Sequence, residues 1–94
     1  MASLHVINVS PDHPRLSECL GYLRHGDTLL LTEDAVMALA DQRIDWPAGI
    51  TLRALSPDLA ARGLDPGRLS VDATPVSYGE FVTLTLESNK VICW

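Results

Sequence analysis

Basic residues are scarce in this 94-residue sequence, in which seven lysines and arginines stand against twelve acidic residues and the formal net charge is −5. Aromatic residues are also few, and Trp46, Tyr78, Phe81 and Trp94 are dispersed along the chain. There is no basic stripe to meet phosphates and no platform of rings on which bases could stack. We therefore expect no direct contact with nucleic acid. Trp94 is expected instead to anchor the chain end or to fill a pocket of a partner.

Long hydrophobic runs are missing as well, because no stretch approaches the ~20 apolar residues of a membrane span. The N-terminus lacks a basic region followed by the apolar core of a signal peptide. We expect a cytoplasmic protein without membrane contact. At 94 residues the chain is long enough for one modest core, so residues 1–94 are expected to form a single domain.

Cysteine occurs twice, at Cys19 and Cys93, without the C-x-x-C spacing of redox and zinc sites. The three histidines, His5, His13 and His25, complete no recognisable set of metal ligands with them. P-loop, dinucleotide and serine-hydrolase motifs are absent too. We expect free thiols, neither metal nor cofactor, and no independent enzyme.

The apolar fraction is high for so short a chain, at 47% with 20% charged residues. Part of the apolar surface is therefore expected to lie against partner subunits. Short apolar runs predict five buried strands. They span residues 4–9, 28–31, 50–55, 69–71 and 90–94.

Helix signals fall between these strands. Leu16, Cys19, Leu20 and Leu23 follow i, i+3, i+4 and i+7 spacing and predict an apolar helical face that begins after Pro14. Thr32 is expected to cap a second helix that runs to about residue 40.

Two further helices carry end signals. Ser56-Pro57 predicts the start of a short helix, and Gly63 with Leu64 predicts a Schellman stop. Ser77 and Glu80 have the spacing of a capping box. The alternation of strands and helices predicts an α/β fold with a mostly parallel five-stranded sheet and helices on both faces.

Several segments, taken in order, resemble the TusB/DsrH family of the DsrE-like fold. They are LHVINVSP (4–11), LSECL (16–20), GDTLLLTEDAVMA (26–38), LRALSPDLAARGL (52–64) and VSYGEFVTLTLESNKVICW (76–94). The resemblance covers nearly the whole chain except residues 41–49, and the ordered set is more specific than any one motif.

The resemblance implies a sulfurtransferase complex that relays sulfane sulfur between carrier proteins, in a heterohexamer with TusC/DsrF-like and TusD/DsrE-like subunits. In the Tus branch, sulfur passes from TusA to TusE for 2-thiolation of the tRNA wobble uridine. In the Dsr branch, a DsrC-like carrier serves dissimilatory sulfur oxidation. The sequence does not separate the branches. The principal accepting cysteine would belong to the TusD/DsrE partner, which leaves this chain a largely non-catalytic, assembling part.

Cys19 is the candidate catalytic residue, because DsrH-type members carry a cysteine in this context and would hold a persulfide there. Arg15, one helical turn earlier, would favour the reactive thiolate. The same position is the centre of an apolar face, where a buried cysteine is simply a small hydrophobe. We prefer this second interpretation, and keep the persulfide as an alternative.

Other candidates have ordinary explanations that we prefer. Cys93 resembles the penultimate cysteine of the TusE/DsrC carriers, but the residues before it belong to a predicted strand. Ser10 and His13 lie where parallel sheets bind anions, yet S-P-D-H-P is also a common turn and helix start. Glu33 and Asp34 fit the first turn of a helix as partners of its dipole. A stand-alone homodimer that binds a small ligand remains a further alternative.

Overall fold

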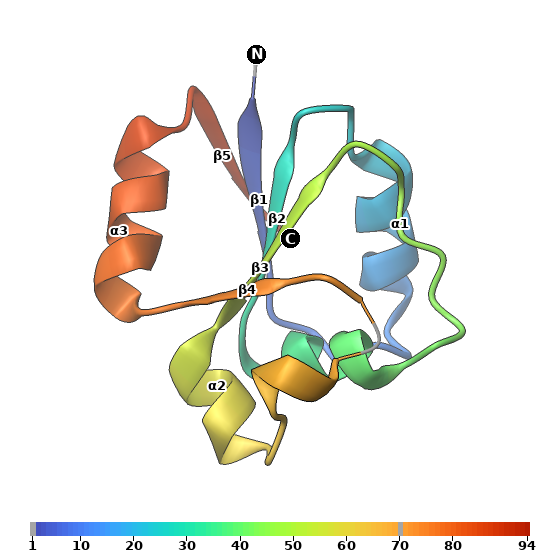
Figure 1. The fold of residues 1–94 in the computed structure, drawn as a ribbon. Helices are drawn as coiled ribbons and strands as arrows, with labels where there is room; N and C mark the ends of the chain where they lie inside the picture. The colour runs from blue at the N-terminus through green and yellow to red at the C-terminus, as the bar shows by residue number, and fades with distance from the viewer. Residues whose placement is uncertain (1, 70) are drawn as a thin grey trace.

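The computed structural model describes residues 2–69 and 71–94 (Figure 1). One five-stranded sheet runs through it in the order β4-β3-β2-β1-β5, and every neighbouring pair is parallel. The strands are β1 Ser3–Ile7, β2 Thr28–Leu31, β3 Thr51–Leu55, β4 Thr74–Val76 and β5 Lys90–Cys93. The predicted parallel α/β fold is confirmed.

Helices cover both faces of this sheet, as predicted, but unequally. They are α1 Pro14–Tyr22, the 3-10 helix η1 Glu33–Ala40, α2 Ser56–Ala61, the short 3-10 turn η2 Pro66–Arg68, and α3 Tyr78–Glu87. Figure 1 shows α3 on one side of the sheet and α1 on the other. The connection that contains α3 leads the chain from β4, at one edge of the sheet, to β5 at the opposite edge. There β5 pairs with β1.

Alternation along the strands separates two cores. In β2, Leu29 and Leu31 point to the face of α1, η1 and α2, whereas Leu30 points to the face of α3. The first core holds twelve buried residues, including Cys19 and Leu59, and the second holds four. Each fully buried leucine contributes about 1.5–3 kcal/mol relative to exposure. Most of the hydrophobic stabilisation therefore comes from the first face.

The predicted local end signals of two helices are confirmed. After α2, Leu64 N donates to Leu59 O and Gly63 N to Ala60 O, which is the hydrogen-bond pair of a Schellman motif. Gly63 has φ 68°, a conformation that glycine adopts without strain. At α3, Ser77 and Glu80 exchange both hydrogen bonds of the capping box.

The predicted fourth strand was wrong. Ser70, in the middle of residues 69–71, lies outside the described residues, and the strand that pairs with β3 is Thr74–Val76. This strand contains Pro75, which cannot donate a backbone hydrogen bond and so weakens a sequence-based strand prediction. The structure tolerates Pro75 because β4 is an edge strand. Leu69 and Val71 instead pack, half-buried, against the first core.

The predicted cap of the second helix was also wrong in detail. Thr32 occupies the N-cap position, but its side chain makes no capping hydrogen bond. Its hydroxyl donates instead to Ile7 O at 3.3 Å, across to the neighbouring strand. The helix that follows is a 3-10 helix of eight residues, which is long for this type.

Candidate functional site

Cys19 lies on α1 and is fully buried in the first core. Burial raises the pKa of the Cys19 thiol to about 12, so the thiol is protonated at neutral pH. Arg15 is exposed on the first turn of the same helix and does not offset this increase. A persulfide acceptor requires a thiolate that a carrier can reach. The surroundings of Cys19 in this chain therefore favour the packing role.

Cys93 differs from Cys19 in being exposed. It lies on the edge strand β5, where its Cα is in register with that of Val6. The strand is held at this point by Trp94, whose backbone N donates to Val6 O at 2.9 Å. Cys93 therefore belongs to a paired strand rather than to a free arm.

Ser10 and His13 form local hydrogen bonds of a turn and a helix cap. The Ser10 hydroxyl donates to Asp12 Oδ1 at 3.0 Å. His13 Nδ1 accepts from Arg15 N at 3.1 Å, which makes His13 the N-cap of α1. Both side chains are exposed. Their geometry is that of the ordinary turn and helix start.

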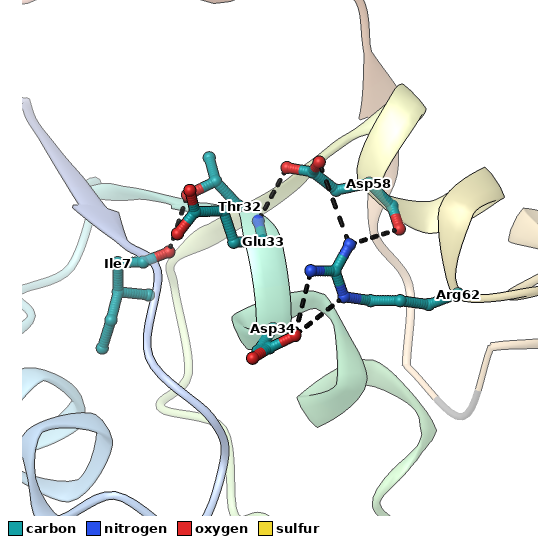
Figure 2. Close-up of polar contacts among 6 residues, drawn as sticks. All are labelled: Ile7, Thr32, Glu33, Asp34, Asp58 and Arg62. Carbon is teal, nitrogen blue, oxygen red and sulfur yellow. Dashed lines mark hydrogen bonds and ion pairs between the residues drawn. The ribbon is translucent and has the colours of Figure 1, made fainter.

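Glu33 and Asp34 take part in a polar network that links η1 to α2 (Figure 2). Arg62 donates through Nε and Nη2 to Asp34 Oδ1, at 3.1 and 2.9 Å, and its Nη1 lies 3.9 Å from Asp58 Oδ1. Asp58 Oδ2 accepts from Glu33 N at 2.7 Å. Figure 2 shows Arg62 between the two aspartates.

This network also explains an unusual backbone conformation. Glu33 has φ 50°, in the left-handed region that costs a non-glycine residue about 1–2 kcal/mol. The hydrogen bond from Glu33 N to Asp58 compensates this strain and fixes the start of η1 at the carboxyl end of β2. The arrangement is structural, because the charged groups of Asp34, Asp58 and Arg62 satisfy one another.

A second polar cluster, which the sequence did not predict, joins β1 to the residue before β2 and the residue after β5. The buried His5 on β1 contacts Asp27 Oδ2 through Nε2 at 3.1 Å. Its Nδ1 accepts from the indole Nε1 of Trp94 at 3.0 Å. Because an indole nitrogen only donates, Nδ1 is unprotonated and Nε2 carries the proton that goes to Asp27. Both ring nitrogens are engaged, so His5 is not free to act as a base.

The Asp27 carboxylate accepts most of the hydrogen bonds of this cluster. It accepts from Arg24 N at 2.9 Å and Ser3 N at 3.1 Å besides His5. Burial alone would raise the pKa of Asp27, but the hydrogen bonds from Arg24, Ser3 and His5 outweigh it and hold that pKa below its ordinary value. Trp94 also stacks on His5, with ring centroids 6.1 Å apart. The cluster fastens Trp94 and the end of β5 to β1.

The helix α3 presents the most unusual surface. None of its ten residues is buried. Tyr78, Val82 and Leu86, which we call the α3 stripe, follow i, i+4, i+8 spacing with exposed fractions of 59%, 56% and 81%. Beneath the helix, Arg53, Val76, Glu80, Thr83 and Leu84 line a cavity of about 210 Å³. The α3 face is therefore both apolar outside and loosely packed below.

Two other classes of site receive no support from the described part of the chain. Among residues 2–69 and 71–94, no group of three histidine, cysteine or acidic side chains is placed to hold a metal ion. No helix there is both long and apolar enough to cross a membrane.

The fold defines a class of small proteins with one parallel α/β sheet. The ychN protein of Escherichia coli superposes with a TM-score of 0.71 over the full length of both chains, at 18% identity. Protein Tm0979 from Thermotoga maritima superposes with a TM-score of 0.69 at 20% identity, over 89% of this chain and 91% of its own. These likenesses establish the fold.

Sequence comparison gives the family. The profile described as DsrH like protein matches residues 9–91. Protein TusB of Klebsiella pneumoniae is 40% identical over 97% of this chain and 99% of its own length. Protein TusB of Escherichia coli is 38% identical over the same shares. This chain belongs to the TusB/DsrH family, as its resemblance had indicated.

Proposed function

We propose that this chain is an assembling subunit of a TusBCD/DsrEFH-like sulfurtransferase complex, which relays sulfane sulfur between carrier proteins in the cytoplasm. Its partners are TusC/DsrF-like and TusD/DsrE-like subunits. The TusB names of its relatives support the route from TusA to TusE, which leads to 2-thiolation of the tRNA wobble uridine.

The observation that carries this proposal is the α3 stripe. A helix that is apolar on its outer side as well as its inner side is normally covered. In α3 only Glu80 and Glu87 are charged, and the outer row consists of Tyr78, Val82 and Leu86. Each square ångström of apolar surface removed from water contributes about 25 cal/mol, so covering this row supplies a driving force for association.

The environment of Cys19 also supports an assembling role rather than a sulfur-accepting one. Its thiol is buried, with the pKa raised to about 12, and this environment does not suit an accepting cysteine. The principal accepting thiol is then left to the TusD-like partner. Loss of this chain would stop the relay because the complex would not assemble.

The test is co-purification of the chain with its C-type and D-type partners. Leu86→Glu places a charge on the α3 stripe at a side chain that is 81% exposed, so the isolated fold is retained. We expect this variant to lose the partners. Met37→Glu on η1 is the matched control, because Met37 is also an exposed apolar residue but lies outside the stripe. It should keep them.

Two outcomes would contradict the proposal. Retention of both partners by Leu86→Glu would remove the α3 stripe from the assembly surface. A stable wild-type homodimer that ignores both partners would favour the small-ligand binder instead. Size-exclusion chromatography with light scattering distinguishes these results.

A further inference from the structure

A polar cavity of about 200 Å³ opens at the amino ends of three neighbouring strands. Ser3 begins β1, Lys90 begins β5 in register with it, and Asp27 directly precedes β2. Tyr22 and Arg24 close the cavity from the end of α1 and the loop that follows. The cavity is separate from both the α3 stripe and Cys19. It adjoins the cluster of His5, Asp27 and Trp94.

The walls of this cavity carry cations without acidic partners. Within the described residues, neither Arg24 nor Lys90 forms an ion pair. By contrast, Arg43 and Arg62 elsewhere in the chain pair with aspartates at 3.0 and 2.9 Å. Arg24 and Lys90 are both exposed and line the same cavity, in a chain with a net charge of −5.

The acceptors at the floor of the cavity are largely occupied by the chain's own donors. The Asp27 carboxylate already accepts from Ser3 N, Arg24 N and the imidazole of His5. The second nitrogen of His5 is occupied by the Trp94 indole. Lys90, the Arg24 side chain and the phenol of Tyr22 are left as donors. Two cations and one carboxylate also leave the cavity with one excess positive charge.

We propose that this cavity binds a small molecule through an oxyanion group, such as a phosphate or a carboxylate, held by Arg24 and Lys90 beside Tyr22. A cationic ligand would meet two like charges at the walls, whereas an oxyanion gains charge-assisted hydrogen bonds from them. The hydrogen bond between His5 and Asp27 below ties β1 to the start of β2. This site is independent of the assembly proposed above.

The indole N–H of Trp94 is a built-in reporter, because it bonds to His5 and its ring lies 5.5 Å from that of Tyr22. We would titrate the full chain with inorganic phosphate and, separately, with acetate, at constant ionic strength in chloride. The ¹H–¹⁵N resonance of the Trp94 indole is followed after assignment with Trp46→Phe. We expect a saturable shift with at least one anion, and the tighter anion identifies phosphate or carboxylate as the group bound.

Variants test the assigned residues. Arg24→Gln and Lys90→Gln should each weaken binding about tenfold, as expected for loss of one charge-assisted hydrogen bond. Arg68→Gln, whose side chain is 87% exposed on η2, removes the same charge at a distant position and should leave the affinity unchanged. Circular dichroism confirms that each variant is folded.

Linear, non-saturating shifts with both anions would overturn the proposal, as would equal weakening in all three variants, which indicates general charge screening. Neither result bears on partner binding through the α3 stripe, so failure of this site is distinguishable from failure of the proposed function.

Discussion

The two faces of the sheet differ in how completely this chain covers them. On the face of α1, η1 and α2, twelve buried residues form a continuous core. On the α3 face, four buried residues are covered by a helix that has no buried residue of its own. The first face is completed within the chain. The second leaves the apolar α3 stripe exposed, and this is the surface that the proposed assembly would cover.

The largest expected effect is on the completed face. Leu29→Ala removes a fully buried side chain from the first core, and the rigid strand around it collapses only partly into the space. We expect the free energy of unfolding to fall by about 3 kcal/mol. Chemical denaturation measures it. A loss below about 1 kcal/mol would mean that the two faces are less different than they appear.

Asp27→Asn comes next, because it replaces a carboxylate that accepts three hydrogen bonds. We expect a loss of about 2 kcal/mol near neutral pH. The pKa of Asp27 is lowered in the folded state, so its contribution is fully present above the ordinary value of 3.8 and is lost as the pH falls through the lower folded value. The stabilities of wild type and variant should therefore converge in acid. A difference that is constant from pH 7 to pH 2 would contradict this.

Cys19→Ala should cost about 1 kcal/mol, because it removes one buried sulfur from the core of the completed face. We expect sulfur relay by the assembled complex to continue. Intact-mass measurement after incubation with a persulfide-loaded TusA-type carrier is the decisive readout. A sulfur adduct on wild type that disappears in Cys19→Ala would instead place a persulfide on Cys19, as in the DsrH-like alternative.

The smallest effect is expected on the α3 face. Leu86→Ala should change the stability of the isolated chain by less than about 0.5 kcal/mol, because the side chain is 81% exposed. The same substitution should weaken partner binding. Thermal unfolding and a binding titration give the two values. A large loss of stability in the isolated chain would show that the Leu86 side chain already packs within it.

Sequence reasoning succeeded where the signal is local. The strand at residues 28–31, the Schellman stop at Gly63 and the capping box of Ser77 and Glu80 each depend on neighbours a few positions apart. It failed at β4, because Pro75 argues against a strand at this position. The strand is allowed because it lies at the edge of the sheet, and that place depends on the whole topology.

Sequence reasoning could not predict contacts between residues far apart in the chain. Asp27 lies 22 positions from His5, and Trp94 lies 89 positions from it. A lone histidine in an apolar strand was the available signal, but it does not identify its partners. Burial of Cys19 followed from helical spacing. Whether a partner covers α3 depends on a second chain, which no single sequence describes.

Hydrogen–deuterium exchange tests the central claim most directly, by comparing the isolated chain with the chain bound to its C-type and D-type partners. We predict strong new protection in α3, residues Tyr78–Glu87, and little change in α1, which the chain already packs. Exchange in α3 that is the same in both states would contradict the claim that α3 is the surface of assembly.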